Sequence, residues 1–273
     1  MQIKIIALDK QEIIFEDLGV VKYKKAWDYQ ESLVLHNLNI KANARKAEQQ
    51  LNHYTGSHCE ILTPTMAAGF AEPSTRHHLL FCEHPPVYTL GKSGHIENVL
   101  LSAGDLEQKE IEFFRTNRGG DITFHGLQQV VGYPILDLEK FYTDLGRYLR
   151  ELEEVILLTI AEYGIAGGRS KGETGVWIDA GVPGKERKIC AMGIRCSRWI
   201  TMHGFALNVN TDLSYFDNII PCGITNKKVT SIERELGFKV EMEEVKDKIR
   251  ANFEKVFQVT FALSRAQTYP MQE

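Results

Sequence analysis

The sequence predicts an α/β or α+β fold in which helices flank a mixed β-sheet. Many short apolar runs of strand length are bounded by Gly, Pro and polar residues, and only a few longer segments have a helical period. Strands and helices do not alternate regularly, which argues against a Rossmann fold. The chain has 273 residues, 43% hydrophobic and 25% charged, so it can bury a sizeable core. We expect one domain over residues 1–273.

The first half of the chain predicts one long helix and several strands. Residues 3–8 and 12–16 are expected to pair as strands, and the spacing of apolar residues predicts a helix over about 23–50. Residues 55–75 are rich in Gly, Pro and Thr and lack a period, so we interpret them as an insertion loop. Apolar runs of strand length follow at residues 79–83, 111–115 and 130–138.

The second half predicts a hairpin among further strands and helices. A helix is expected over residues 144–164, and Gly164 ends it. Residues 176–178 and 188–195 are expected to form the hairpin. The remaining elements are two strands, at 199–201 and 205–209, and two helices, at 229–236 and 241–257.

Composition excludes several classes of protein. A net charge of −4 argues against a nucleic-acid partner, because nucleic-acid binders usually carry a basic balance. No apolar run approaches the ~20 residues of a membrane span, and the N-terminus lacks the features of a secretory signal. The five cysteines are scattered, which suits a reducing cytoplasm rather than a disulfide framework. No Cys-x-x-Cys is present and the pair His77-His78 stands alone, so we expect no metal site.

A short polar stretch, Arg118-Gly119-Gly120-Asp121-Ile122-Thr123-Phe124-His125-Gly126, comes just before the predicted strand at 130–138. The Gly-Gly pair lets the backbone turn sharply and leaves its N–H groups open to a ligand. If the stretch after it is extended, Asp121, Thr123 and His125 lie on one side, and the two apolar residues lie on the other. The alternative is an ordinary hairpin with a surface histidine.

A cysteine and a lysine are the candidate reacting groups. Cys222 lies between a proline and a glycine, which suits an exposed thiol in a tight turn, whereas Cys82 and Cys190 fit small buried hydrophobic residues. Lys188 begins a strand in which it alternates with apolar residues, so its ammonium either points inward toward a partner or reaches solvent at the strand end. Gly193 in the same strand allows close approach of a ligand or of another backbone.

A second His-Gly pair, His203-Gly204, again enters a predicted strand and is followed by Phe205. Two such pairs at two strand entrances suggest two edges of one pocket. The alternative is two turn histidines whose hydrogen bonds are satisfied locally.

Five motifs occur in one order along the chain. They begin at Arg118, at Tyr133 (Tyr-Pro-Ile-Leu-Asp-Leu), at Lys188 (Lys-Ile-Cys-Ala-Met-Gly-Ile-Arg), at His203 (His-Gly-Phe-Ala-Leu-Asn-Val-Asn) and at Pro221 (Pro-Cys-Gly-Ile). In this order the sequence resembles the octanoyltransferase family of lipoate biosynthesis. The resemblance covers about residues 20–240, and residues 83–91 (Glu-His-Pro-Pro-Val-Tyr-Thr-Leu-Gly) are an earlier marker of it.

The resemblance implies a biotin/lipoate protein ligase-like fold and a cytoplasmic acyltransferase that needs no cofactor. Its donor would be octanoyl-acyl carrier protein, and its acceptors would be lipoyl domains of 2-oxoacid dehydrogenase E2 subunits and the glycine cleavage H protein. By this resemblance Cys222 holds the acyl group as a thioester and Lys188 activates it. The acyl and carbonyl site would comprise Arg118, Gly119, Gly120, Asp121, Ile122, Thr123, Phe124, His125, Ala191, Met192, Gly193, His203, Gly204 and Phe205.

The chain departs from the family pattern near the first histidine. Phe124 replaces the usual tyrosine, which removes a hydroxyl near the expected pocket, and Leu127-Gln128 replaces a Pro-Gly pair. Both protein partners are acidic as a rule in this family, so we expect a basic face that includes Arg118, Lys188 and Arg195.

Three other functions stay open. An ATP-dependent lipoate or biotin protein ligase would share the fold but would need no cysteine nucleophile. A non-catalytic protein that binds acyl carrier or lipoyl domains would have no use for Cys222 with Lys188. A hydrolase with a Cys–His pair could use His125 or His203 as its base.

Overall fold

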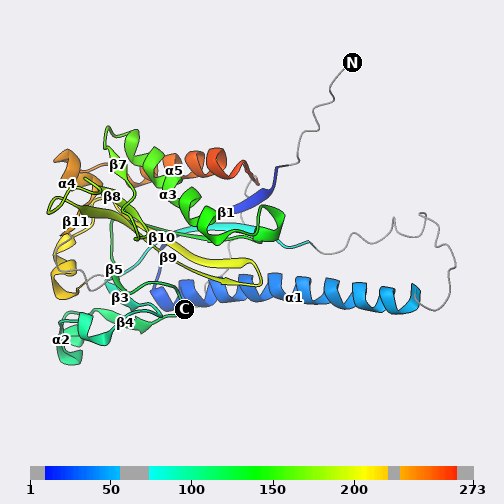
Figure 1. Ribbon diagram of the computed structural model, residues 1–273. Helices are drawn as coiled ribbons and strands as arrows, with labels where there is room; N and C mark the ends of the chain where they lie inside the picture. Colours follow the sequence, from blue (N-terminus) through cyan, green and yellow to red (C-terminus); the bar gives the residue numbers. More distant parts are fainter. Residues whose placement is uncertain (1–9, 56–73, 221–227, 263–273) are drawn as a thin grey trace, which may run out of the picture.

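The computed structural model describes residues 10–55, 74–220 and 228–262, with only the backbone for residues 51–55. The predicted strand at 3–8, nearly all of the predicted loop at 55–75, and Cys222 lie outside the described residues. Within them, the predicted mixed sheet with flanking helices is confirmed (Figure 1).

The main sheet has nine strands, in the order β12-β1-β2-β6-β10-β9-β8-β7, and β11 also pairs with β9. β1 pairs in parallel with both β2 and β12, and β11 is parallel to β9, whereas the pairs from β2 through β7 are antiparallel. The strands are β1 Glu12–Val20, β2 His77–Glu83, β6 Gln129–Ile135, β7 Gly167–Gly168, β8 Val176–Ile178, β9 Arg187–Ser197, β10 Ile200–Asn208, β11 Lys228–Val229 and β12 Thr260–Phe261.

A second sheet of three strands lies below the main sheet in Figure 1. β3 (Val87–Leu90) is its central strand, with β4 (Glu112–Arg115) parallel to it and β5 (Ile122–His125) antiparallel to it. The short helix α2 (Ala103–Gln108) precedes β4 and packs beside it, and was not predicted from the sequence. Its capping box, in which Ser102 and Asp105 bond each other's backbone N–H, explains why a six-residue helix forms there.

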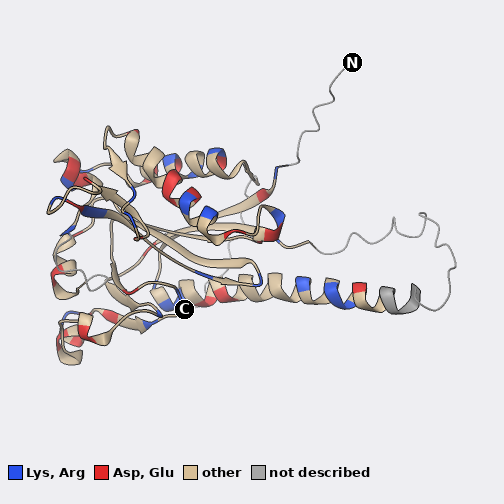
Figure 2. Ribbon diagram, in the orientation of Figure 1, with Lys and Arg blue, Asp and Glu red and all other residues tan. Residues whose placement is uncertain are grey.

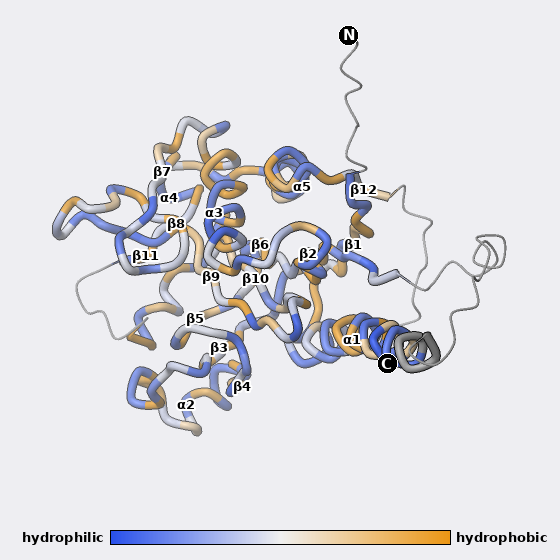
Figure 3. The backbone as a smooth tube through the Cα atoms, turned by 45° about the vertical axis from the view of Figure 1, so that its right-hand side comes forward, coloured by the Kyte–Doolittle hydropathy of each residue, from blue (hydrophilic) through white to orange (hydrophobic). Residues whose placement is uncertain are grey.

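Helices cover both faces of the main sheet. α3 (Leu145–Ala161) and α5 (Met242–Phe257) lie on one face, and α1 (Tyr23–Thr55) lies along the other and extends beyond the sheet (Figure 1). Alternation along β2 supplies both cores, since Leu79 and Phe81 join the core under α3 and α5, whereas Leu80 and Cys82 join the core under α1. Figure 3 shows hydrophobic and hydrophilic residues alternating along these helices, as one buried face requires.

The helix predicted over residues 144–164 ends at Ala161, and Gly164 closes the turn that follows it. The N–H of Ile165 bonds the carbonyl of Ile160, the N–H of Gly164 bonds that of Ala161, and Gly164 has φ +74°. This is the Schellman pattern, in which glycine takes the left-handed position without a steric penalty.

Two predictions about the second half were wrong in detail. The strands predicted at 199–201 and 205–209 are one continuous strand, β10, because His203 keeps its place in the β9–β10 ladder despite φ +60°. The helix predicted at 229–236 begins only at Ile232, as α4 (Ile232–Leu236), because Lys228 and Val229 pair with β9. Within the described part of the chain, no helix has the length and hydropathy to cross a membrane.

Candidate active site

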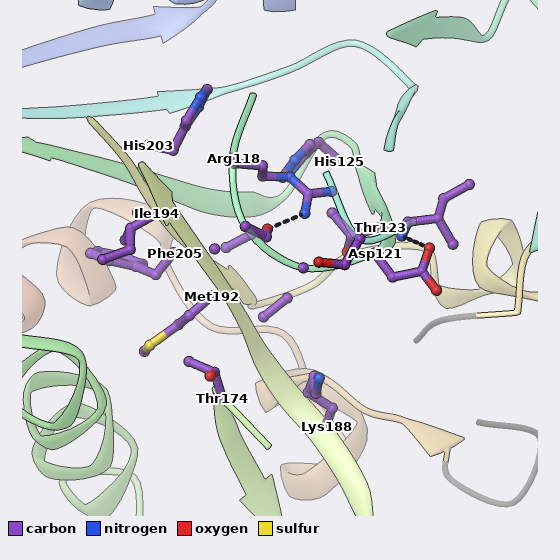
Figure 4. Close-up of a pocket in the computed structure, with 18 of the residues that line it drawn as sticks. Arg118, Asp121, Thr123, His125, Thr174, Lys188, Met192, Ile194, His203 and Phe205 are labelled. Carbon is purple, nitrogen blue, oxygen red and sulfur yellow. Dashed lines mark hydrogen bonds between the residues drawn. The ribbon is translucent and has the colours of Figure 1, made fainter. Parts of the chain in front are cut away.

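A cavity of about 830 Å³ lies between the main sheet and the smaller sheet. Strands β6, β9 and β10 contribute one side, and β5 with the turn before it contributes the other. The cavity brings together nearly all the described residues that the sequence predicted for the site: Arg118, Gly119, Gly120, Asp121, Ile122, Thr123, His125, Lys188, Ala191, Met192, Gly193, His203, Gly204 and Phe205. Figure 4 shows Lys188 and His203 at opposite ends of the drawn site.

Phe124 is the described residue of that prediction that does not line the cavity. Its ring stacks on Tyr215 with centroids 4.6 Å apart and meets Phe216 edge-on at 5.5 Å, in the core of the smaller sheet. It points away from its neighbours Thr123 and His125 because side chains alternate along β5. The hydroxyl that this chain lacks at position 124 would therefore not have faced the cavity.

The Arg-Gly-Gly turn is clamped between the two sheets. Gly119 donates its N–H to the carbonyl of Ile194 at 2.8 Å, so this N–H is not open to a ligand as the sequence suggested. A Cβ on Gly193 would lie 2.7 Å from the Gly119 carbonyl oxygen. Gly193 is thus required by the close approach of another backbone rather than of a ligand.

On the other side of the turn, the segment after β3 holds it in the same way. The N–H groups of Lys92 and Ser93 bond the carbonyls of Arg118 and Gly120, at 2.9 and 3.2 Å. A Cβ on Gly91 would lie only 2.2 Å from the Gly120 oxygen. The turn therefore keeps one conformation through backbone contacts on both sides.

Arg118 is buried and bonded inside the protein. Its Nη2 donates to both the carbonyl and the Oγ1 of Thr89, the latter at 3.0 Å, and its Nη1 donates to the Gly119 carbonyl at 3.0 Å. Arg195 forms an ion pair with Glu31 at 2.6 Å. Arg118 and Arg195, two of the cations expected on a basic face, are thus engaged within the fold. Figure 2 shows the two signs of charge mixed over the described elements.

His125 uses both of its ring nitrogens. Gln129 donates its amide N–H to Asn208 Oδ1 at 2.8 Å, so Gln129 Oε1 is an acceptor and His125 Nδ1 donates to it at 2.9 Å. The other nitrogen, Nε2, then accepts from the Thr89 hydroxyl at 3.3 Å. His125 is held as one neutral tautomer with no nitrogen left over, which argues against its service as the base of a Cys–His hydrolase.

Burial lowers the pKa of three histidines at or beside the cavity, namely His84, His125 and His203. It lowers the pKa of His84 to about 4, and together with the Arg118 and Arg195 cations it lowers the pKa of His203 to about 3. For His125, burial is reinforced by His84 and Arg118, and its pKa lies well below the usual value.

His203 is fixed by residues of α1. Its backbone N–H donates to Gln30 Oε1 at 3.0 Å, which holds the unusual φ of +60°. Its ring Nε2 lies 2.7 Å from Asn117 Oδ1, and Asn117 Nδ2 donates to Glu31 Oε1 at 3.0 Å. Because the Glu31 carboxylate fixes the orientation of the Asn117 amide, Nε2 must carry the ring proton of His203.

Lys188 lies at the start of β9, half-buried, with its Nζ 4.5 Å from the centroid of the Trp177 ring. Cys222 lies outside the described residues, but both described ends of its segment reach the cavity rim. The N–H of Ile220 bonds the carbonyl of Asn98, which lines the cavity, and Val229 pairs with Lys188 itself.

The cavity also contains residues that the sequence did not single out. Tyr133 lines it, and because His84 Nδ1 donates to the Val21 carbonyl at 2.7 Å, the Tyr133 hydroxyl donates to His84 Nε2 at 2.8 Å. Tyr133 and Asn208 belong to the quoted motifs, and Gln129 follows the first motif by three residues, so the signal was present in the sequence. No sequence motif marked Tyr23 as a site residue. It is the first residue of α1 and reaches the cavity only through the packing of this helix against residues distant in sequence.

Comparison with known proteins first identifies the class of catalytic domain to which the chain belongs. The family model of the lipoyl protein ligase A/B catalytic domain matches residues 60–254. The bi-partite lipoate protein ligase of Thermoplasma acidophilum superposes with a TM-score of 0.60 at 15% identity, over 92% of this chain and 86% of that one. At this identity the likeness shows the fold alone, and the predicted lipoate protein ligase-like fold is confirmed.

Two relatives of high sequence identity then identify the family within this class. The octanoyltransferases of Flavobacterium psychrophilum and Christiangramia forsetii are 54% and 50% identical to this chain over 249 residues, which is 91% of the chain and 97% of each relative. The chain belongs to the octanoyltransferase family, as the order of its motifs suggested.

Proposed function

We propose that the protein transfers an octanoyl group from octanoyl-acyl carrier protein to a lysine of lipoyl domains, as an acyltransferase with residues 1–273 as one domain. The observation that carries this proposal is that Lys188 and both described ends of the Cys222 segment meet at one cavity. Membership of the octanoyltransferase family supports the same reaction.

In the first half-reaction, the Cys222 thiolate attacks the carbonyl carbon of the octanoyl thioester. The carbon–sulfur bond to the carrier breaks, and the carrier thiolate takes up the proton that the Cys222 thiol had released. One thioester replaces another, so the step needs no ATP. Lys188 as an ammonium favours the thiolate of Cys222.

In the second half-reaction, the amine of the acceptor lysine attacks the Cys222 thioester. A carbon–nitrogen bond forms, the Cys222 thiolate leaves, and the proton of the amine passes to a base, for which Lys188 in its neutral form is the proposed group. The clamped Arg-Gly-Gly turn, Ala191 to Gly193 and His203 to Phe205 would hold the acyl chain. A site closed to water would keep the thioester from hydrolysis.

The partners in this proposal are those that the resemblance to the octanoyltransferase family implies. The donor is an acyl group on a carrier thiol, and the acceptors are lipoyl domains of 2-oxoacid dehydrogenase E2 subunits and the glycine cleavage H protein. The scattered cysteines of the sequence favour a reducing cytoplasm as the place of reaction.

An acceptor-modification assay tests the proposed reaction. A lipoyl domain is incubated with the protein and octanoyl-acyl carrier protein without ATP, or with free octanoate and ATP. We expect mass spectrometry to find octanoylation of one acceptor lysine only with the carrier-bound donor. Modification that requires ATP and free octanoate would instead identify a ligase.

A further inference from the structure

A β-bulge turns Lys188 toward the cavity. Trp177 of β8 pairs with Lys188 of β9, but the residue before it, Val176, pairs with Cys190. Ile189 is therefore an extra residue in β9, and an extra residue shifts the alternation of side chains by one. Cys190 accordingly lies in the core under α3 and α5, whereas Lys188, two residues before it, lines the cavity. Regular alternation from Cys190 would have directed the lysine into that apolar core.

The same pairing places Lys188 beside the ring of Trp177. Residues that pair directly across antiparallel strands point to the same face of the sheet. The neighbours of Trp177 on β8, Val176 and Ile178, both belong to the core under α3 and α5, so the indole lies on the opposite face. Nζ of Lys188 is 4.5 Å from the centroid of this ring, within the ~6 Å at which a cation and an aromatic face attract each other.

The part of the chain that contacts Lys188 is itself held in place. Trp177 is only 2% exposed, and its strand lies between β7 and β9. At the entry to this strand, a Cβ on Gly175 would lie 3.7 Å from Cδ of Lys188, so the stem of the lysine passes beside this glycine. The N–H of Gly175 donates to the buried Glu153 carboxylate at 2.9 Å. The stem and the ammonium of Lys188 thus both contact a fixed part of β8 and its entry.

An aromatic face suits a lysine that must change its charge during the reaction. The π-electrons of an indole attract an ammonium but do not accept its proton, so the ring stabilises the charged form. That form is the one that the first half-reaction uses to favour a thiolate. The attraction is weaker than that of a buried carboxylate, so the amine can still lose its proton, as the second half-reaction requires.

We propose that Trp177 is the positioning residue of Lys188, and that its ring holds the lysine ammonium at the cavity for the reaction. This inference rests on the proposed function, because Trp177 acts on the chemistry only through Lys188. The indole takes no part in bond making.

Graded loss of the ring tests this role. Acylation by octanoyl-acyl carrier protein is followed by intact mass in a single turnover, for wild type, Trp177→Phe and Trp177→Leu. Phenylalanine keeps a ring with a weaker face, and leucine has no ring. We expect the rate to fall about twofold in Trp177→Phe and about fivefold in Trp177→Leu, as for loss of a partly buried cation–π contact. Trp199→Leu is the matched control, because Trp199 is half-buried between β9 and β10 and does not line the cavity, and it should keep the wild-type rate.

A double-mutant cycle with Lys188→Met separates positioning from a merely structural role. If Trp177 acts through Lys188, Trp177→Leu should have no further effect on the rate once the amine is gone. If acylation of Lys188→Met is too slow to follow, alkylation of Cys222 by iodoacetamide, measured by peptide mass, replaces acylation in all four proteins. If Trp177→Leu does not fold, as judged by circular dichroism, replacement of tryptophan by 5-fluorotryptophan weakens the ring face with little change of shape, and the same cycle is measured.

The outcomes separate the two proposals. Slowing by Trp177→Leu that disappears in Lys188→Met would support the positioning role. A wild-type rate in folded Trp177→Leu, or equal slowing with and without Lys188, would overturn this role while leaving the transferase intact. If wild type forms no acyl-enzyme, the proposed reaction fails, and the alkylation cycle then decides on Trp177 by the same two criteria.

Discussion

At the scale of single residues, the site is built from neutral histidines in fixed tautomers. A carbonyl sets the tautomer of His84, the Gln129 amide sets that of His125, and the Asn117 amide sets that of His203. None of these orientations follows from the local sequence, because each partner comes from another element. The motifs predicted which residues meet, whereas the hydrogen bonds that decide their chemistry needed the structure.

The buried histidines predict how stability depends on pH. The folded-state pKa of His77, His84 and His203 lies at about 4, 4 and 3, below the unfolded value of about 6.5. Between about pH 4 and 6.5 the unfolded state therefore binds more protons, so stability is complete above pH 6.5 and falls as pH falls. We expect urea unfolding to lose on the order of 1–2 kcal/mol per histidine from pH 7.5 to 5. A free energy of unfolding that stays constant from pH 7.5 to 5 would contradict the claim that these histidines are neutral in the folded protein.

Replacement of Lys188 tests its role in the reaction. Lys188→Met keeps the length of the side chain but removes the amine, so we expect transfer to slow by about 10²- to 10⁴-fold, as for loss of an acid–base group. Loss of the contact between Nζ and the Trp177 ring should itself cost about 1 kcal/mol of stability. Lys185→Met, in the exposed turn of the same hairpin, is the control and should leave the rate unchanged. A Lys188→Met enzyme with normal turnover would exclude the proposed role.

At the scale of elements, periodicity predicted the long pieces well and tertiary pairing decided the short ones. α1, α3 and α5 appear where apolar spacing placed them, and the hairpin of β8 and β9 is confirmed. The two-residue strands β7, β11 and β12 carry no periodic signal, because they exist only through pairing with a neighbour. The sequence did not predict β10 as one continuous strand, because the left-handed residue within it, His203, is stabilised by Gln30, which is distant in sequence.

Helix α3 anchors the loop at the cavity mouth through one buried carboxylate. Glu153 is fully buried and accepts from the Gly175 N–H at 2.9 Å and from Arg169 Nε at 3.0 Å. We expect Glu153→Gln to lower the free energy of unfolding by about 1–3 kcal/mol, because an amide cannot accept at both ends. Transfer should weaken too, since residues 172–174 line the cavity. Glu154→Gln removes an exposed partner of the same Arg169, and should change stability by no more than about 0.5 kcal/mol. An equal loss of stability in Glu153→Gln and Glu154→Gln would contradict the claim that Glu153 anchors this loop.

At the scale of the whole molecule, the cavity exists because two sheets meet through glycines. The Arg-Gly-Gly turn packs against Gly193 of strand β9 in the main sheet and against Gly91, which follows strand β3 of the smaller sheet. A Cβ on either glycine would clash with a carbonyl oxygen of the turn. The sequence indicated glycines near a ligand, but these positions serve contact between backbones. The family resemblance named residues that line one cavity, whereas the reason for each glycine came from the packing of the sheets.

Gly193→Ala tests this contact. The added Cβ would lie 2.7 Å from the Gly119 carbonyl oxygen, so the turn must move away from β9. We expect a loss of about 1–3 kcal/mol in the free energy of unfolding and weaker binding of octanoate. Gly104→Ala is the control, because α2 is exposed there and a Cβ would meet nothing closer than 3.9 Å. Wild-type stability and binding in Gly193→Ala would show that the sheets do not need this approach.

The central claim is that Cys222 carries the octanoyl group between two proteins. The most direct measurement is the intact mass of the protein after reaction with octanoyl-acyl carrier protein without ATP, for wild type and Cys222→Ala side by side. We predict that wild type gains one octanoyl group, that hydroxylamine releases it as expected for a thioester, and that Cys222→Ala gains none. An unmodified wild type that still octanoylates the acceptor, or an adduct of equal size on Cys222→Ala, would contradict the claim.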